Sequence, residues 1–299
     1  MEQDGDRVLS SEEPLEAVIK RVTLGAGARV VGIAAAESFR DYAPEGHRPE
    51  DLLPGARSVV VFGGPTLTAG AWRSPEPRFM SQNKVFALQR KGTAVKVALW
   101  IEENTGHYAV YYDGVRESGL NPYLSLKLAA ELAGLGTRSL AGGVILNPEI
   151  GLMNLSLVIT TLALEPDAPL SDPVCPHPSC VVVWEARGTT PCLESCPECL
   201  SGELKDGRID HMEYERFRCV PRATTAGVHA FLKLLQEAFA LDDAEERNAL
   251  LSGDLFTRTV TSLGFGSELV AGCFKCLSRC PVCLSGTRLK TDVTHQTKA

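Results

Sequence analysis

The sequence predicts a protein of the α+β class in two parts, an α/β core over residues 1–170 and a cysteine-rich part over residues 171–299. Helix-like and strand-like apolar patterns alternate through the first part. All ten cysteines lie in the second part, between positions 175 and 283. With 44% hydrophobic and 22% charged residues, the chain has the composition of a folded globular protein rather than of a disordered one.

Apolar periodicity places the elements of each part. In the core, helices are expected at 15–24, 85–105 and 122–135, and strands at 28–35, 58–63, 108–113, 142–146 and 155–164. The last two strands alternate in the manner of a pair. Residues 38–56 and 66–77 are expected to be loops. A loop-like stretch at 167–173 marks the boundary between the parts. A helical insertion at about 220–270 interrupts the cysteines, with helices at 226–240, 243–251 and 256–263.

The spacing of the cysteines indicates their chemistry. Dense cysteines in a cytosolic chain more often bind metal than form disulfides. Residues 273–281 read C-x2-C-x3-C-P and residues 192–197 read C-x3-C-P. Two C-x3-C-P units are typical of ferredoxins with two clusters, in which the last cysteine of each unit binds the other cluster. The second part is therefore predicted to be a ferredoxin-like domain with two [4Fe-4S] clusters.

The crossover rule divides eight of the ten cysteines into two ligand sets. Cys199 and Cys283 are left over, and each stands two residues after the proline of a C-x3-C-P unit. Each could be a swapped ligand, a reactive thiol or a packed thiol, and we favour the packed thiol. Three C-x2-C pairs have the spacing of zinc knuckles, but zinc does not explain the doubled C-x3-C-P. The first predicted set is Cys175, Cys180, Cys192 and Cys280, and the second is Cys196, Cys219, Cys273 and Cys276.

The net charge and the absence of targeting patterns argue against several classes of function. The net charge is −7 and only 6% of residues are aromatic, which argues against a broad nucleic-acid-binding surface. The acidic N-terminus lacks the pattern of a signal peptide. No stretch reaches the roughly 18 consecutive apolar residues of a membrane span. We therefore expect a soluble cytoplasmic protein without a membrane partner.

The order of several motifs resembles the epoxyqueuosine reductase and corrinoid reductive dehalogenase superfamily over residues 25–283. The motifs are PGARSVVV at 54–61, KLAAELAGLG at 127–136, NPEIG at 147–151, the stretch 160–170 and both C-x3-C-P units. The resemblance implies a nitroreductase-like α/β core that holds base-off cobalamin. It also implies that an external low-potential donor feeds electrons through the clusters, for a reductive reaction on a small molecule or a corrinoid.

The resemblance also implies site residues. Tyr123 is a candidate proton donor, since dehalogenases of this superfamily use a tyrosine beside the cobalt, although an ordinary tyrosine at a helix start is the favoured interpretation. Three further candidates do not come from the resemblance. His177, between two cysteines, could ligate iron or tune a cluster by hydrogen bonding, and direct ligation is the less favoured of these. His107 could be a cobalt or proton ligand, although an ordinary surface histidine is favoured, and one of Tyr111 and Tyr112 should point inward, with core packing as the favoured role. Glycines permit close approach of a flat cofactor, or merely form turns. The candidate cobalamin-binding residues are Gly134, Gly136, Gly142, Gly143 and Asn147.

The sequence departs from the family pattern at four places. The insert 181–191 stretches the first ligand motif to C-x4-C-x11-C-x3-C-P. No aspartate stands in the stretch 117–123, where epoxyqueuosine reductases carry a proton donor. Thr137 replaces an aromatic residue. The helical repeats used on tRNA are missing, so tRNA is not expected as a substrate. Two other functions stay open, namely an electron carrier or corrinoid-activating partner without cobalamin, and a zinc-stabilised binding module.

Overall fold

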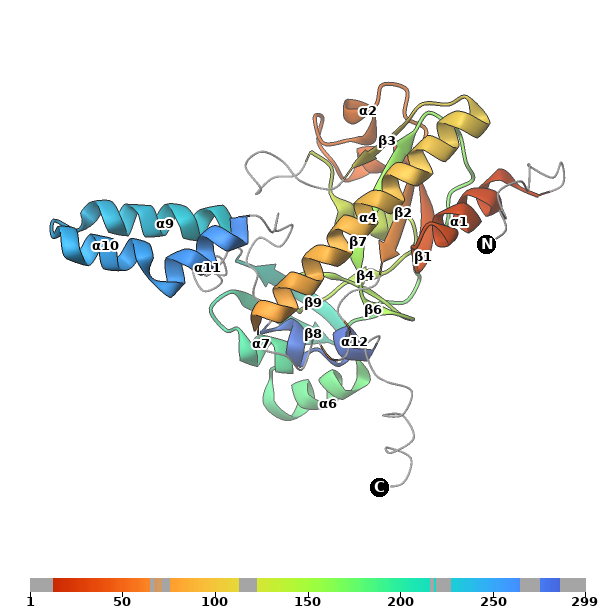
Figure 1. Cartoon of the computed structure of the whole chain (residues 1–299). Coiled ribbons are helices and arrows are strands. Elements are labelled where there is room, and N and C mark those ends of the chain that lie inside the picture. The colour runs from red at the N-terminus through yellow and green to blue at the C-terminus, as the bar shows by residue number, and fades with distance from the viewer. Residues whose placement is uncertain are drawn as a thin grey trace.

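The computed structural model describes residues 13–64, 68, 70, 76–112, 123–215, 218, 227–263 and 275–285. Figure 1 shows an α/β core at the upper right, the cysteine-rich segments beneath it, and a group of three helices that extends to the left. Mixed helix and strand content agrees with the predicted class. Among the described residues, no helix combines the length and the apolar character needed to cross a bilayer.

The core is built on a four-stranded antiparallel sheet with the order β1-β2-β7-β3. Its strands are β1 (Val30–Ala35), β2 (Ser58–Gly64), β7 (Asn154–Thr160) and β3 (Ala109–Tyr112). Every residue of β2 is buried. A central strand that is covered on both faces reads as a continuous apolar run, which is why SVVVFG at 58–63 predicted this strand.

Helices cover both faces of this sheet. α1 (Leu15–Gly25) and α4 (Glu76–Thr105) pack on one face, around fully buried Ile19 and Phe62. α5 (Leu126–Leu132) packs on the other face through Ala129 and Ala130. Figure 1 shows α4 running the length of the sheet. These three helices were predicted, although α4 begins earlier in the chain and α5 is shorter.

A second, three-stranded sheet contradicts one predicted pairing. β5 (Ile145–Asn147) pairs with β4 (Thr137–Arg138) and β6 (Gly151–Leu152), whereas β7 pairs with β2 and β3. The expectation that 142–146 and 155–164 pair with each other was therefore wrong. The cause is a turn in which Asn147 Oδ1 accepts hydrogen bonds from the N–H groups of Glu149 and Ile150, both at 2.9 Å. This turn folds β6 back on β5 before the chain enters β7.

Short helical segments lie within the expected loop 38–56, namely η1 (Ala36–Asp41) and α2 (Pro49–Leu52). After β7 the chain stays attached to the core as far as Asp167. The carboxylate of Asp167 accepts hydrogen bonds from the Ile33 N–H at 2.8 Å and from Lys20 Nζ at 2.5 Å. The division of the chain at residue 170 stays a prediction.

The cysteine-rich part consists of short elements. They are α6 (Pro178–Arg187), α7 (Pro191–Ser195), the hairpin of β8 (Leu200–Lys205) and β9 (Arg208–Tyr214), η2 (Leu277–Arg279) and α12 (Pro281–Ser285). The sequence did not predict α6 or the hairpin. The hairpin turns at Asp206 and Gly207, both with positive φ, as an Asp-Gly turn requires.

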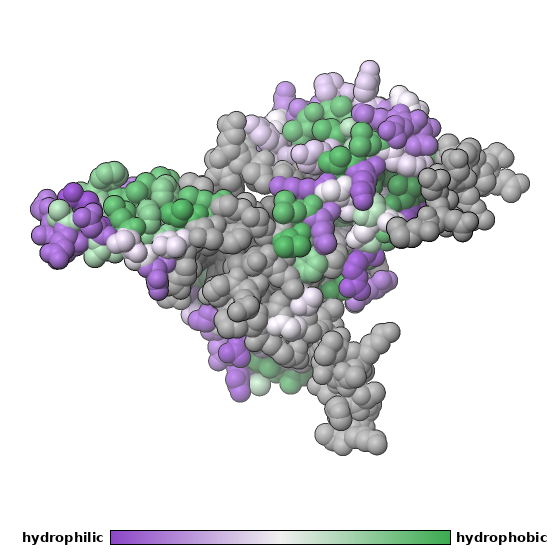
Figure 2. All heavy atoms as spheres, in the orientation of Figure 1, coloured by the Kyte–Doolittle hydropathy of each residue, from purple (hydrophilic) through white to green (hydrophobic). Residues whose placement is uncertain are grey.

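The predicted insertion contains the three expected helices, α9 (Gly227–Ala240), α10 (Ala244–Ser252) and α11 (Asp254–Leu263). They pack on one another, and the rings of Phe231 and Phe256 lie 6.1 Å apart between centroids. Figure 2 shows apolar residues gathered on the visible face of this unit. Phe239 of α9 is 82% exposed.

Candidate metal centre

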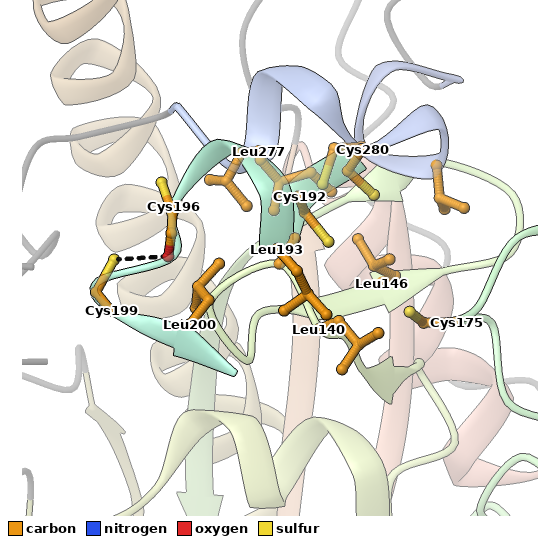
Figure 3. Packing of buried hydrophobic residues seen from close by; sticks show 14 of the residues in the cluster. Leu140, Leu146, Cys175, Cys192, Leu193, Cys196, Cys199, Leu200, Leu277 and Cys280 are labelled. Carbon is orange, nitrogen blue, oxygen red and sulfur yellow. Dashed lines mark hydrogen bonds between the residues drawn. The ribbon is translucent and has the colours of Figure 1, made fainter. Parts of the chain in front are cut away.

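Four cysteines from different segments line one cavity. Cys175, Cys180, Cys192 and Cys280 each expose only 7 to 8% of their surface, and all four line one small cavity. Figure 3 shows three of them, Cys175, Cys192 and Cys280, among buried leucines. These four residues are the predicted first ligand set. The cavity also borders Leu140 and Ala141, so the α/β core forms one of its walls.

The insert 181–191 does not separate Cys180 from Cys192 in space. Cys180 lies in α6, which begins after His177 and ends at Gly188 in the left-handed conformation that favours glycine. The chain then turns back, and α7 begins at Pro191. Most of the insert therefore forms helix α6, and the chain after this helix brings Cys192 back to the cavity.

His177 caps α6. Its Nδ1 accepts a hydrogen bond from the Ser179 N–H at 3.2 Å and lies 2.8 Å from Ser179 Oγ. The residue is exposed. A capping role explains a histidine at this place, although its side chain also borders the cavity.

Cys175 is anchored to the core through its neighbour. The N–H of Val174 donates a hydrogen bond of 2.8 Å to Thr137 Oγ1 on β4. Thr137 directly follows the AGLG sequence, and its hydroxyl fixes the segment that delivers Cys175. Cys280 is held at the start of α12, where its N–H donates to the Leu277 carbonyl at 3.2 Å.

Burial and hydrogen bonding act on these thiols in opposite directions. Burial raises the pKa of Cys175 to about 12 and that of Cys180 to about 11. Burial also raises the pKa of Cys192, against a hydrogen bond with Thr190. In contrast, a hydrogen bond from the Cys283 thiol lowers the pKa of Cys280 to about 7, and the same bond raises the pKa of Cys283.

The second predicted ligand set is described only in part, because Cys219 and Cys273 lie outside the described residues. Cys196 is buried in the same apolar cluster as Cys175, Cys192 and Cys280 of the first set, and Cys276 packs against that cluster. Cys276 Sγ lies 3.8 Å from the point where a Cβ on Gly142 would stand. In Figure 3, Cys196 and Cys199 lie apart from Cys192 and Cys280.

Both leftover cysteines are buried, as the packed-thiol interpretation expects. Cys283 exposes 1% and Cys199 exposes 7% of its surface. The Cys199 thiol donates to the main-chain carbonyl oxygen of Cys196 at 3.8 Å. All eight described cysteines are free thiols rather than disulfides.

The cavity differs from a site for one metal ion. Within the described ranges, no three His, Cys, Asp or Glu side chains stand close enough to bind a single ion. Around zinc, all four sulfurs lie about 2.3 Å from one atom. In a cubane cluster each thiolate binds a different iron, so the sulfurs stand further apart. Four cysteine thiols on one cavity are the kind and number of donors that such a cluster takes.

The residues predicted to bind cobalamin make internal contacts. A Cβ on Gly134 or Gly136 would lie 2.3 Å from the carbonyl oxygen of Ala168 or Leu146. Asn147 Nδ2 donates to the Leu135 carbonyl at 2.7 Å. These three residues face the protein's own main chain rather than a cradle for a corrin, and cobalamin binding there stays a prediction.

Gly142 and Gly143 both have positive φ and form a turn between β4 and β5. A Cβ on Gly143 would lie 3.7 Å from Nζ of Lys127, a residue that the sequence analysis did not single out. Burial, and to a smaller extent Arg138, lower the pKa of Lys127 to about 8, while Glu131 opposes this shift. The turn therefore has a partly buried lysine on one side and Cys276 on the other.

The candidate tyrosines and His107 have ordinary surroundings. Tyr123 is 38% exposed beside the start of α5. Tyr112 points inward, as expected for one of the pair, and its hydroxyl accepts a hydrogen bond from the Leu124 N–H at 3.1 Å, while Tyr111 is exposed. His107 is exposed, with Nδ1 3.4 Å from Thr161 Oγ1.

Comparisons with known proteins give the fold its class. No protein-family model and no curated protein sequence matches the chain. Its structure is similar to epoxyqueuosine reductase from Bacillus subtilis (18% identity, TM-score 0.53) and from Streptococcus thermophilus (16%, 0.52), with 92% of this chain and 67% of each reductase covered. It is also similar to a variant of the catabolic reductive dehalogenase NpRdhA (19%, 0.51), with 90% of this chain and 38% of the dehalogenase covered.

The chain therefore has the fold of the epoxyqueuosine reductase and reductive dehalogenase superfamily, and the predicted resemblance is confirmed at the level of the fold. A further epoxyqueuosine reductase of the same fold (18% identity, TM-score 0.52) was solved with an epoxyqueuosine-modified tRNA stem loop. The comparison thus gives no support to the expectation that tRNA is excluded as a partner.

Proposed function

We propose that the chain is an iron–sulfur oxidoreductase in which Cys175, Cys180, Cys192 and Cys280 bind one [4Fe-4S] cluster. One observation carries this proposal: four buried thiols from both ends of the cysteine-rich part converge on a single cavity. The fold that the chain shares with solved reductases supports the same function.

The protein's part is to hold the thiolates and to exclude water. Burial disfavours the free thiolates of Cys175 and Cys180, so the positive charge of iron is what would stabilise them as ligands. The apolar wall of Leu140, Ala141 and Val282 keeps the cavity dry. When bound, such a cluster supplies one-electron transfer at a low potential.

A second [4Fe-4S] cluster is proposed at Cys196, Cys219, Cys273 and Cys276. Support comes from the doubled C-x3-C-P and from the packing of Cys196 and Cys276 with one apolar cluster. The same group of packed apolar residues also contains Cys175, Cys192 and Cys280 of the first set. Two iron–sulfur centres at these positions would therefore be neighbours, as electron transfer between them requires.

We propose a reductive reaction on a small molecule or a corrinoid, with cobalamin as the reacting centre and an external low-potential donor as the electron source. The shared fold supports this part of the proposal. Tyr123, a partly exposed phenol, is the proposed proton donor. Gly134, Gly136 and Asn147 contact the protein's own main chain, so these three residues are not part of the proposed cobalamin site.

The test is anaerobic purification of the full chain, followed by iron and sulfide analysis, absorption and EPR spectra. The wild-type protein should bind about eight irons and Cys180→Ala about half as many. Cys199→Ala, which removes an equally buried thiol, should keep the wild-type iron content. A colourless protein that contains zinc would overturn the proposal. Titration of this protein with cobalamin then tests whether cobalamin is the reacting centre. A protein that binds clusters but shows no saturable corrin binding would be an electron carrier or a corrinoid-activating partner.

A further inference from the structure

Two buried side chains outside the proposed ligand set lie beside the sulfurs of proposed ligands. Thr190 is 1% exposed, and its Oγ1 lies 3.3 Å from Cys192 Sγ. Thr190 precedes α7, and its carbonyl oxygen accepts the Glu194 N–H at 2.9 Å. The hydroxyl is therefore held in place by the same turn that delivers Cys192 to the cavity.

The direction of this hydrogen bond follows from ligation. In the metal-free protein either the Thr190 hydroxyl or the Cys192 thiol can donate. A cysteine sulfur bound to iron carries no proton and can only accept. With the cluster bound, Thr190 must be the donor. Since Thr190 is buried, water does not compete for the sulfur.

Cys283 has the same relationship to Cys280. It is 1% exposed on α12, and a hydrogen bond from its thiol is the main cause that lowers the pKa of Cys280, whose sulfur borders the cavity. Once Cys280 is bound to iron, the proton of this bond must belong to Cys283. Cys199 occupies the matching position after Cys196, yet its thiol donates to a main-chain carbonyl oxygen. The two leftover cysteines therefore differ in what they contact.

We propose that the Thr190 hydroxyl and the Cys283 thiol tune the cluster held by Cys175, Cys180, Cys192 and Cys280, raising its reduction potential. This inference rests on the proposed function. Reduction adds one electron from the external donor, and part of its charge resides on the cysteine sulfurs. A donor that faces a sulfur stabilises the more negative, reduced state. No bond breaks in this step, and each proton stays on Thr190 Oγ1 or Cys283 Sγ.

Anaerobic potentiometric titration of the reconstituted full chain, followed by EPR, tests this role. Thr190→Val and Cys283→Ala should each keep both clusters and lower one of the two midpoint potentials. The expected effect is up to about a tenfold change in the reduction equilibrium, which is about 59 mV for one electron. Thr190→Ser and Cys283→Ser keep a donor and should retain the wild-type midpoint. Cys199→Ala is the matched control and should leave that midpoint unchanged.

Several outcomes would overturn the inference. If Thr190→Val and Cys283→Ala both keep the wild-type midpoint reduction potentials, the two hydrogen-bond donors do not tune the cluster. Loss of iron in Cys283→Ala would make Cys283 a ligand instead. If Thr190→Val does not fold, Thr190→Ala supplies the same comparison. A wild-type protein that takes up no cluster would refute the proposed function itself, whereas intact clusters with unchanged potentials would refute only this inference.

Discussion

Thr137 Oγ1 accepts a hydrogen bond from the main-chain N–H of Val174 across 2.8 Å, and this bond joins the α/β core to the residue next to Cys175. Both groups are partly buried. The threonine stands directly after the AGLG sequence at the end of α5. The position of the first cysteine therefore depends on a polar contact with the core and not only on its own segment.

Thr137→Val should therefore loosen the cysteine cavity. The variant leaves the Val174 N–H without its acceptor, which costs about 1–2 kcal/mol of stability. We expect a lower unfolding midpoint and faster loss of iron to a chelator. Thr137→Ser keeps the acceptor and should resemble the wild type. Equal chelation rates for the valine and serine variants would show that the bond does not hold this segment.

The spacing of the cysteines predicted four residues that line one cavity, because closely spaced cysteines are brought together by local chain geometry. Apolar alternation was a weaker guide. It identifies the face to which a side chain points but not the partner strand, so 142–146 and 155–164 were paired wrongly. What decided the pairing was the Asn147 turn, which brings β6 to β5. The hairpin of β8 and β9 was missed, although Asp206-Gly207 between alternating residues was a usable signal.

Thr190 and Lys127 could not be identified from the sequence. Thr190 belongs to no motif, Lys127 is only the first residue of the KLAAELAGLG sequence, and each acquires its surroundings only through the fold. Thr190 reaches Cys192 because α6 ends at Gly188 and the chain returns to the cavity. Likewise, residues 76–84 carry few apolar side chains, so the first turns of α4 had no periodic signal. For Thr190 and Lys127, tertiary contacts rather than local preference fix the surroundings.

Asn147→Ala distinguishes a structural asparagine from a cofactor ligand. Asn147 is 6% exposed and makes three hydrogen bonds of 2.7 to 2.9 Å to main-chain groups of Leu135, Glu149 and Ile150. Their loss leaves partly buried backbone groups unpaired, at a cost of about 2–4 kcal/mol. Denaturant unfolding of the metal-free protein should show this loss. Unchanged stability together with weakened corrin binding would instead support the predicted cofactor role.

Lys127 should make stability depend on pH in the alkaline range. Its folded-state pKa of about 8 lies below the ordinary value of 10.5, first because of burial and then because of Arg138. Between these two values the unfolded chain binds a proton that the folded chain has released. The free energy of unfolding contributed by this group therefore rises with pH from about 8 to about 10.5.

Lys127→Met removes this dependence. Since the buried charge opposes folding below pH 8, the variant should be more stable at neutral pH, by at most about 3 kcal/mol. Thermal unfolding at several pH values provides the comparison, with Lys233→Met on the exposed surface of α9 as the control. A variant that is less stable than the wild type at neutral pH would show that contacts of the ammonium group outweigh its burial.

The thiols of the cavity should differ in reactivity before any cluster is assembled. Cys175, Cys180 and Cys280 are equally buried, yet the pKa is about 12, about 11 and about 7, respectively. Alkylating agents react with the thiolate. In the reduced, metal-free protein at about pH 8, Cys280 should therefore be modified first, as peptide mass spectrometry can follow. Its rate should level off above neutral pH, because the thiol is then ionised, while the rates at Cys175 and Cys180 continue to rise toward pH 10.

Cys283→Ala removes the hydrogen bond that lowers the pKa of Cys280, so it should slow modification of Cys280 and leave Cys175 unaffected. Equal rates at the three thiols would mean that access, and not ionisation, controls their chemistry.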